Sequence, residues 1–146
     1  MNDQRKQFIE LLQKDSKLLK MLATNKAFWN EGLDPSKKFS IVPVDKGSDR
    51  MNTPFISVQV SADNLLGNNL SDVFIYVRCY NRTDKTFVDI DKVLSRVKVL
   101  LQSHRFDQYA DNAVSIDTVY ESTGPDSTDQ GYNLNYRESR YRVLYL

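Results

Sequence analysis

One stretch near the middle of the chain, Ser71–Gln102, constrains the fold more than any other, because the spacing of its apolar residues changes partway along it. From Val73 to Cys79 bulky side chains fill the odd and the even positions, which is typical of a central strand with no face left to solvent. After the polar segment Asn81–Lys85 the apolar residues recur every three or four positions. These are Phe87, Ile90, Val93, Leu94, Val97, Leu100 and Leu101. The spacing predicts an amphipathic helix that packs back on the sheet.

Helical spacing also marks the N-terminal segment, which divides into two pieces at a polar hinge. The apolar residues that share a face are Phe8, Leu11 and Leu12 in the first piece and Leu18, Leu19 and Leu22 in the second. Asn2 or Asp3 can cap the first helix, because short polar side chains accept hydrogen bonds from free backbone N–H groups. Asp15 or Ser16 can cap the second helix in the same way. We expect Trp29 to anchor these helices on the sheet.

Four further strands are expected, which with the central one makes about five. They are Phe39–Val44, Phe55–Ser61, Ala113–Glu121 and Leu134–Leu146. Pro43 lacks a backbone N–H, so the end of the first strand is expected to be an edge or a bend. The polar residues Arg137–Arg140 are expected to split the last strand. The third, Ala113–Glu121, alternates so that one of its faces is polar.

The order of these elements predicts the fold class. A helical segment is followed by three strands, one helix and two strands, with short turns between strands instead of regular strand–helix alternation. This order favours an α+β fold with a mostly antiparallel or mixed sheet. A chain of 146 residues fits one domain, and no linker divides it, so we expect a single domain over residues 1–146.

Two loops stand out by their composition. Ala62–Leu70 carries Leu65, Leu66 and Leu70 among Asn and Gly, an unusual mixture for a solvated turn. Either this loop folds back on the core or it meets another chain. Ser122–Tyr132 is acidic, contains Gly and Pro, and is expected to be a long hairpin loop.

Composition and motifs argue against several kinds of chemistry. One His and one Cys are too few for the usual zinc sites, and the five glycines are isolated and not grouped in a phosphate loop. Asp89–Asp91 falls in the first helical turn, where carboxylates complement the helix dipole. Cys79 is expected to be a small buried apolar residue. We therefore expect no catalytic, cofactor-binding or metal-binding residue, and we interpret the chain as a non-enzyme.

The charge balance bears on partners and location. The chain has 20 Lys and Arg against 19 Asp and Glu, a net charge of +1, whereas a protein that coats nucleic acid carries a basic excess. The N-terminal residues are too polar for a signal peptide, and no apolar run reaches membrane-spanning length, so we expect a soluble protein made in the cytoplasm without membrane contact. Eight Tyr and seven Phe suggest aromatic surface buried between subunits, although cores rich in β-strands also use aromatic residues freely.

The order of segments resembles the tail terminator, or tail completion, family of long-tailed bacteriophages. The segments that carry the resemblance are FIELLQKDSKLLKML, SIVPVDKG, TPFISVQV, DVFIYVRCYNRTDKTFVDIDKVLSRVKVLL and SRYRVLYL. They cover nearly the whole chain. The long segment Ala27–Lys38 departs from the family pattern and leaves the entry to the sheet undefined.

The resemblance implies a non-enzymatic virion protein without a cofactor. Such a protein forms a ring, usually a hexamer, at the head-proximal end of the tail. The ring caps the tail tube, joins the head-closure protein, and lets DNA pass through its lumen without specific binding. Under this hypothesis the two loops contact neighbours, and the interface candidates are Leu65, Leu66, Leu70, Asp126, Asp129 and Tyr132. The alternatives are another head–tail connector component, a small non-viral protein-binding domain, and, last, an enzyme with an unrecognised site.

Overall fold

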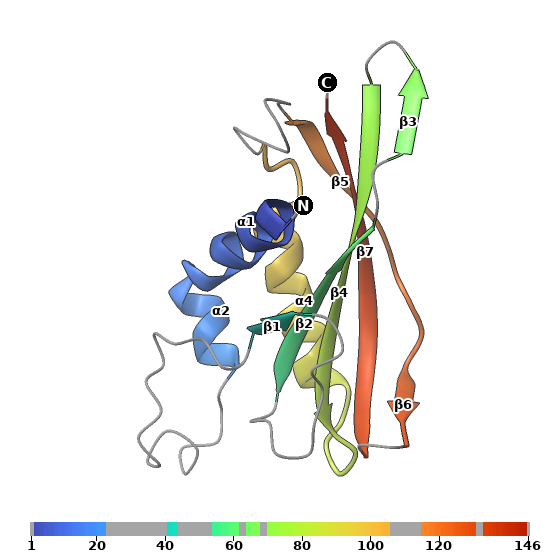
Figure 1. The fold of residues 1–146 in the computed structure, drawn as a ribbon. Helices are drawn as coiled ribbons and strands as arrows, with labels where there is room; N and C mark the ends of the chain where they lie inside the picture. Colours follow the sequence, from blue (N-terminus) through green and yellow to red (C-terminus); the bar gives the residue numbers. More distant parts are fainter. Residues whose placement is uncertain are drawn as a thin grey trace.

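The fold is one sheet with its helices packed on one face (Figure 1). The computed structural model describes residues 2–22, 41–43, 54–61, 64–67, 70–105, 115–130 and 133–145. The helices are α1 (Asn2–Gln13), α2 (Ser16–Met21) and α4 (Val88–Leu101). This architecture confirms the predicted α+β class, with an N-terminal helix and one long amphipathic helix on the sheet. Trp29 and the segment Ala27–Lys38 lie outside the described residues.

The sheet is mixed, as predicted. Its strands in the described part of the chain are β1 (Ile41–Pro43), β2 (Phe55–Val60), β3 (Asn64–Gly67), β4 (Leu70–Arg82), β5 (Ser115–Thr123), β6 (Ser127–Asp129) and β7 (Leu134–Tyr145). The main order is β1-β2-β4-β7-β5, while β3 pairs with β4 and β6 pairs with β7. β1 runs parallel to β2, and the other pairings between these strands are antiparallel. The strand expected to be central, β4, therefore lies between β2 and β7.

Seven strands correspond to about five passes of the chain, because two passes are interrupted. β2 pairs Val60 with Ile75, and β3 then pairs Asn64 with Asp72, so both strands follow the same edge of β4. β5 and β6 follow β7 in the same manner. A local irregularity of this kind bends a strand without ending the pairing. The prediction of about five strands is thus confirmed.

Two expectations about loops and one about the last strand were wrong. Ala62–Leu70 contains β3, and Ser122–Tyr132 contains β6 and the end of β5. The Asn, Ser and Thr residues of these segments join the sheet because long neighbouring strands offer them backbone partners. Arg137–Arg140 does not split β7, which pairs with β4 without interruption from Ser71 to Arg82. Alternating side chains can be polar on one face while the backbone ladder continues.

The core lies between the sheet and the helices. On β4 the odd positions predicted to be apolar, from Val73 to Cys79, are fully buried on this side. The helical residues that meet them are Phe8, Leu12, Leu18, Leu22, Ile90, Val93, Leu94, Val97 and Leu101. Each such side chain stabilises the fold by roughly 1.5–3 kcal/mol relative to an exposed one. Burial raises the pKa of the Cys79 thiol, in keeping with its predicted role as a small apolar residue.

An ion pair fixes α2 to α4. Asp15 caps α2 by accepting a hydrogen bond from the Leu18 N–H at 2.8 Å. The same carboxylate accepts two hydrogen bonds from Arg96 of α4, from Nε at 2.8 Å and from Nη2 at 2.6 Å. The hydrogen bonds from Arg96 lower the pKa of Asp15. The sequence offered Asp15 or Ser16 as the cap; in the structure Asp15 is the cap and also has a partner on a distant helix.

Candidate interaction surface

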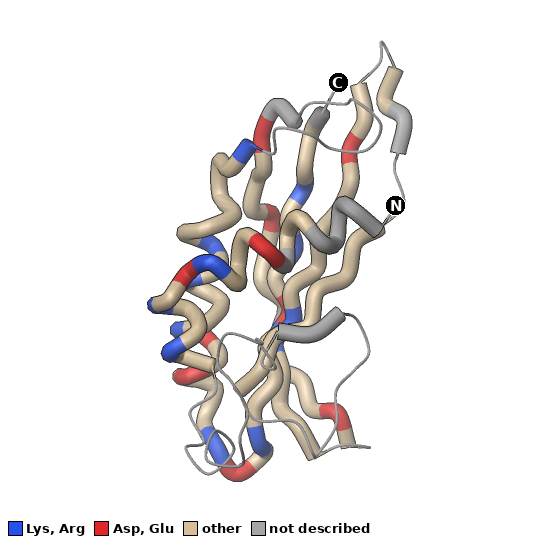
Figure 2. The backbone as a smooth tube through the Cα atoms, turned by 60° about the vertical axis from the view of Figure 1, so that its left-hand side comes forward, with Lys and Arg blue, Asp and Glu red and all other residues tan. Residues whose placement is uncertain are grey.

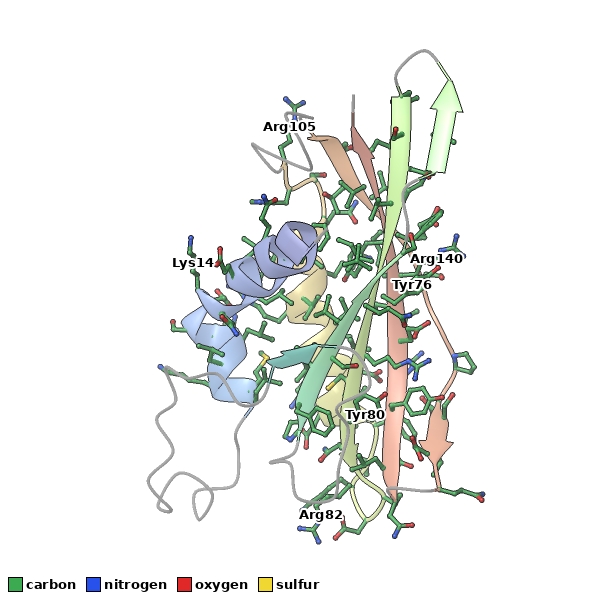
Figure 3. All side chains as sticks on the ribbon, viewed as in Figure 1. Lys14, Tyr76, Tyr80, Arg82, Arg105 and Arg140 are labelled. Carbon is green, nitrogen blue, oxygen red and sulfur yellow. The ribbon has the colours of Figure 1, made fainter. Side chains whose placement is uncertain are left out.

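The face of the sheet opposite the helices, called the open face below, carries no helix of the described part of the chain (Figure 1). Its β4 residues Phe74, Tyr76 and Arg78 are half-buried. Figure 3 shows Tyr76 and Arg140 pointing away from the helices. The expectation that β4 has no face left to solvent was therefore wrong. The bulky side chains at even positions pack on one another across the strands, and no described helix covers them.

Ion pairs between neighbouring strands neutralise the arginines of the open face. Arg78 Nε lies 2.6 Å from Glu138 Oε2 on β7, directly opposite in the register. Arg142 Nε lies 2.7 Å from Asp72 Oδ2. Desolvation lowers the pKa of Arg78, but its hydrogen bonds to Glu138 and Tyr80 outweigh that effect and leave the pKa raised. These guanidinium groups are held in place and are charged at every physiological pH.

Aromatic rings fill the space between the ion pairs. The Arg140 guanidinium lies over the Phe74 ring at 4.0 Å from its centroid, and that of Arg78 lies over Tyr136 at 4.9 Å. Tyr80 stacks on a neighbouring β2 ring, Phe55, with 4.9 Å between centroids. Such contacts add roughly 0.5–1.5 kcal/mol each beyond burial. Tyrosine and arginine are the residues that interface cores favour.

Two polar atoms on the open face are buried without a hydrogen bond. They are Asp72 Oδ1 and Arg140 Nε. The Asp72 side chain is only 5% exposed, and Arg140 Nε lies 3.2 Å from Glu121 Oε1 in an ion pair that lacks hydrogen-bond geometry. An unsatisfied buried polar atom costs about 1–3 kcal/mol, so such atoms call for an explanation. Both atoms are shielded from solvent, so this cost falls within the fold itself.

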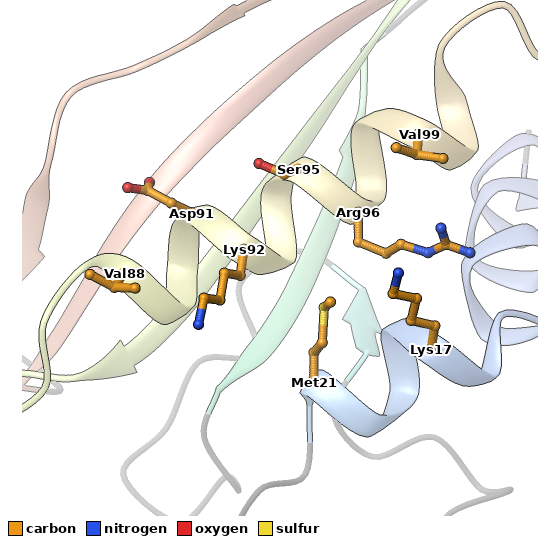
Figure 4. Close-up of a pocket in the computed structure, with 8 residues that line it drawn as sticks. All are labelled: Lys17, Met21, Val88, Asp91, Lys92, Ser95, Arg96 and Val99. Atoms are coloured by element: carbon orange, nitrogen blue, oxygen red, sulfur yellow. The ribbon is translucent and has the colours of Figure 1, made fainter.

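A groove lies on the opposite, helical side of the molecule, between α2 and α4 (Figure 4). Its volume is about 450 Å³. Val88 and Val99 of α4 line it and are 54% and 66% exposed, and Met21 of α2 faces them across the groove. Lys17 and Lys92 place ammonium groups at its margin (Figure 4). The groove thus combines an apolar strip with positive charge.

The residues predicted as interface candidates do not form one site. Leu66 is 46% exposed and Leu70 is half-buried; Leu66 belongs to β3 and Leu70 is the first residue of β4, so both lie in the hairpin of these strands. Leu65 takes part in the β3 pairing through its backbone. Asp126 forms an ion pair with Arg137 at 3.3 Å. Of the other two candidates, Asp129 lies in β6 and Tyr132 lies outside the described residues.

The two candidate groups lie near opposite ends of the sheet (Figure 1). β3 pairs with the first residues of β4, from Leu70 to Asp72, while β6 pairs with the first residues of β7, which lie opposite the end of β4. At about 3.3 Å per residue, the length of β4 separates the groups by roughly 30 Å. The two groups can therefore take part in two different contacts but cannot both belong to one small contact.

The open face and the groove were missed from the sequence. The alternation of aromatic and Arg residues in β4 and β7 was the available signal, since Phe74, Tyr76 and Arg78 share one face, as do Arg140 and Arg142. The groove has no signal of its own, because it depends on how α2 packs against α4.

Figure 2 shows Lys and Arg positions interspersed with Asp and Glu positions along the backbone of the described residues. Within the described part of the chain, no group of three or more His, Cys, Asp and Glu residues is placed to hold a metal ion. The described helices are also too short or too polar to cross a membrane. The open face combines arginines and tyrosines, which are residue types enriched in protein interfaces.

Comparisons with known proteins define the class of fold. No protein-family model matches the chain, and no curated protein matches it. Among solved structures, the virion of a native gene transfer agent particle contains a chain of similar fold, with a TM-score of 0.60 and 7% sequence identity. The similarity covers 94% of this chain and 90% of that chain. At this identity the likeness shows that the two chains share a fold.

Proposed function

We propose that this chain is a structural protein of a phage-like virion and, more specifically, a tail terminator. The observation that supports the proposal best is the shared fold with a chain of a gene transfer agent virion, which extends over nearly all of both chains. The order of segments in the sequence, which resembles the tail terminator family, supports the same role independently.

In this role the protein forms a ring, expected to be a hexamer, at the head-proximal end of the tail. The ring stops growth of the tail tube and joins the tube to the head-closure protein. A closed ring needs head-to-tail contacts, so each subunit must present two different surfaces. The open face and the groove are two such surfaces, and the β3 and β6 ends of the sheet are candidates for contacts above and below the ring.

Electrostatics are compatible with a lumen through which DNA passes. The chain carries 20 Lys and Arg against 19 Asp and Glu, a net charge of +1, so it offers little excess positive charge to phosphates. A protein that binds the phosphate backbone of DNA needs unpaired Lys and Arg, because neutralisation of the phosphates provides most of the affinity. We propose that the ring lets DNA pass without binding it specifically, and that the protein has no catalytic activity and no cofactor.

The proposal can be tested with purified protein and growing tail tubes of the same particle. The terminator role predicts that adding this chain stops tube growth, so that mean tube length falls as its concentration rises. Unchanged tube length at saturating concentration would sink this role. If the chain then bound the head-closure protein alone, it would be a different head–tail connector. A light-scattering mass close to a multiple of the monomer, alone or on the tube, is expected in either case.

A further inference from the structure

The groove between α2 and α4 and the open face lie on opposite sides of the same two-layer domain (Figures 1 and 4). The groove belongs to the helical layer, and the open face is the far side of the sheet. Surfaces on opposite sides of a domain cannot meet within one copy. They can meet between copies in a head-to-tail contact, which builds a ring when the rotation between copies closes and an open filament when it does not.

The two surfaces are complementary in charge. On the open face the carboxylates outnumber the guanidinium groups by one: they are Asp72, Asp117, Glu121 and Glu138 against Arg78, Arg140 and Arg142. The groove has the opposite balance, because its one carboxylate, Asp91, already pairs with Arg137. Lys17 and Lys92 leave it positive.

The two surfaces also match in the kinds of contact they need. The exposed side chains of Val88 and Val99 are apolar and would be covered by the half-buried rings of Phe74 and Tyr76. An ammonium group gains energy over an aromatic face, and more so when water is excluded.

The size of the open face suits a stable contact. It spans β2, β4, β7 and β5 in the order of the sheet. Four strands about 4.8 Å apart and roughly 30 Å long give a flat footprint on the order of 600 Å². The side chains add relief to this footprint, which brings it near the roughly 800 Å² per partner of a standard interface.

We propose that the groove of one copy docks on the open face of the next copy, and that this contact builds the ring. The proposal rests on the ring assembly proposed above and names the surfaces that form it. It predicts a heterologous contact between Lys17 and Lys92 on one side and the β4–β7 surface on the other.

The first test uses Gln59, an exposed β2 residue opposite Tyr76 on the open face and outside its ion pairs. Gln59→Lys places a cation against the lysines of the groove and is expected to weaken self-association at least tenfold. Gln59→Glu is the matched control of opposite charge and is expected to leave association unchanged or tighter. Lys92→Glu should restore association to Gln59→Lys, whereas Lys85→Glu, in the turn before α4, should not. Masses are measured by light scattering across a concentration series, and circular dichroism checks that each variant is folded.

The second test does not depend on the register of the contact. A Lys92→Cys variant is labelled with a benzophenone maleimide, because Cys79 is buried and leaves the new thiol as the reactive one. Irradiation of the oligomer is expected to cross-link the label to peptides of β4 or β7 from another copy. Cross-links to α2 or α4 of another copy, or to other segments only, would overturn the proposal while leaving the ring role intact. A wild-type protein that stays monomeric both in solution and on tail tubes would contradict the ring itself.

Discussion

The hydroxyl of Tyr141 lies in the core without a hydrogen bond, and replacing it tests the packing described above. The side chain is fully buried on the helical side of β7, and its oxygen has no partner among the described residues. The ring meets Tyr120 edge-on at 5.6 Å between centroids, a contact that Phe would preserve. Tyr141→Phe therefore removes an unsatisfied polar atom and little else.

We expect Tyr141→Phe to stabilise the fold by about 1 kcal/mol, the lower end of the roughly 1–3 kcal/mol that an unsatisfied buried group costs. For a domain of this size that gain raises the melting temperature by roughly 3 °C. Urea unfolding should show a higher midpoint with an unchanged slope. Tyr120→Phe is the matched control, because the Tyr120 hydroxyl bonds Thr123 Oγ1 at 2.6 Å, and its loss should cost about 1 kcal/mol.

The pH dependence gives this prediction a second readout. Burial raises the pKa of Tyr141, so the unfolded chain ionises this tyrosine first, near its ordinary pKa of about 10. The contribution of Tyr141 to the free energy of unfolding is therefore constant below that pH and decreases as the pH rises above it. The advantage of Tyr141→Phe over the wild type should therefore grow above pH 10. A variant less stable than the wild type by more than about 0.5 kcal/mol at pH 7 would refute the reasoning, since the hydroxyl would then have a partner.

Three further predictions concern the helices and the β3 hairpin. Asp15→Ala should cost about 1 kcal/mol through loss of the α2 cap. Because Arg96 lowers the pKa of Asp15, that cost should be present above about pH 4 and fade as pH falls below it, as urea midpoints between pH 3 and 6 would show. Ile90→Ala should lower the free energy of unfolding by about 3 kcal/mol, because Ile90 is fully buried. Val99→Ala, on the exposed face of the same helix, should change it by no more than about 0.5 kcal/mol. Equal losses of the two variants in thermal unfolding would place the core elsewhere. Leu66→Asp should leave the monomer as stable as wild type and weaken assembly, and an unfolded monomer would make Leu66 a core residue.

The period of apolar residues was enough to predict the scaffold. The change of spacing after Val73–Cys79 located the central strand and the helix that covers it, because burial against one layer imposes a fixed period on each element. The same spacing gave the buried stripe of the N-terminal helices. The Asp15 cap followed from local chemistry alone.

What the sequence did not reveal depends on contacts between distant segments. Arg96 lies 81 residues from the carboxylate that it binds, and no local pattern links the two. β3 (NLLG) and β6 (STD) are short and contain Asn, Gly, Ser and Asp, which favour turns, and they become strands because β4 and β7 offer backbone partners. Bulk on both sides of β4 was interpreted as two-sided burial, although on one side the rings and arginines cover one another.

The most direct test of the proposed role is to image tail tubes grown in the presence of this chain, with the chain labelled. The tail terminator role predicts a closed ring of this protein at one end of each tube, and tubes that no longer lengthen once the ring is present. Label along the sides of the tubes, or tubes that keep growing with bare ends, would contradict it.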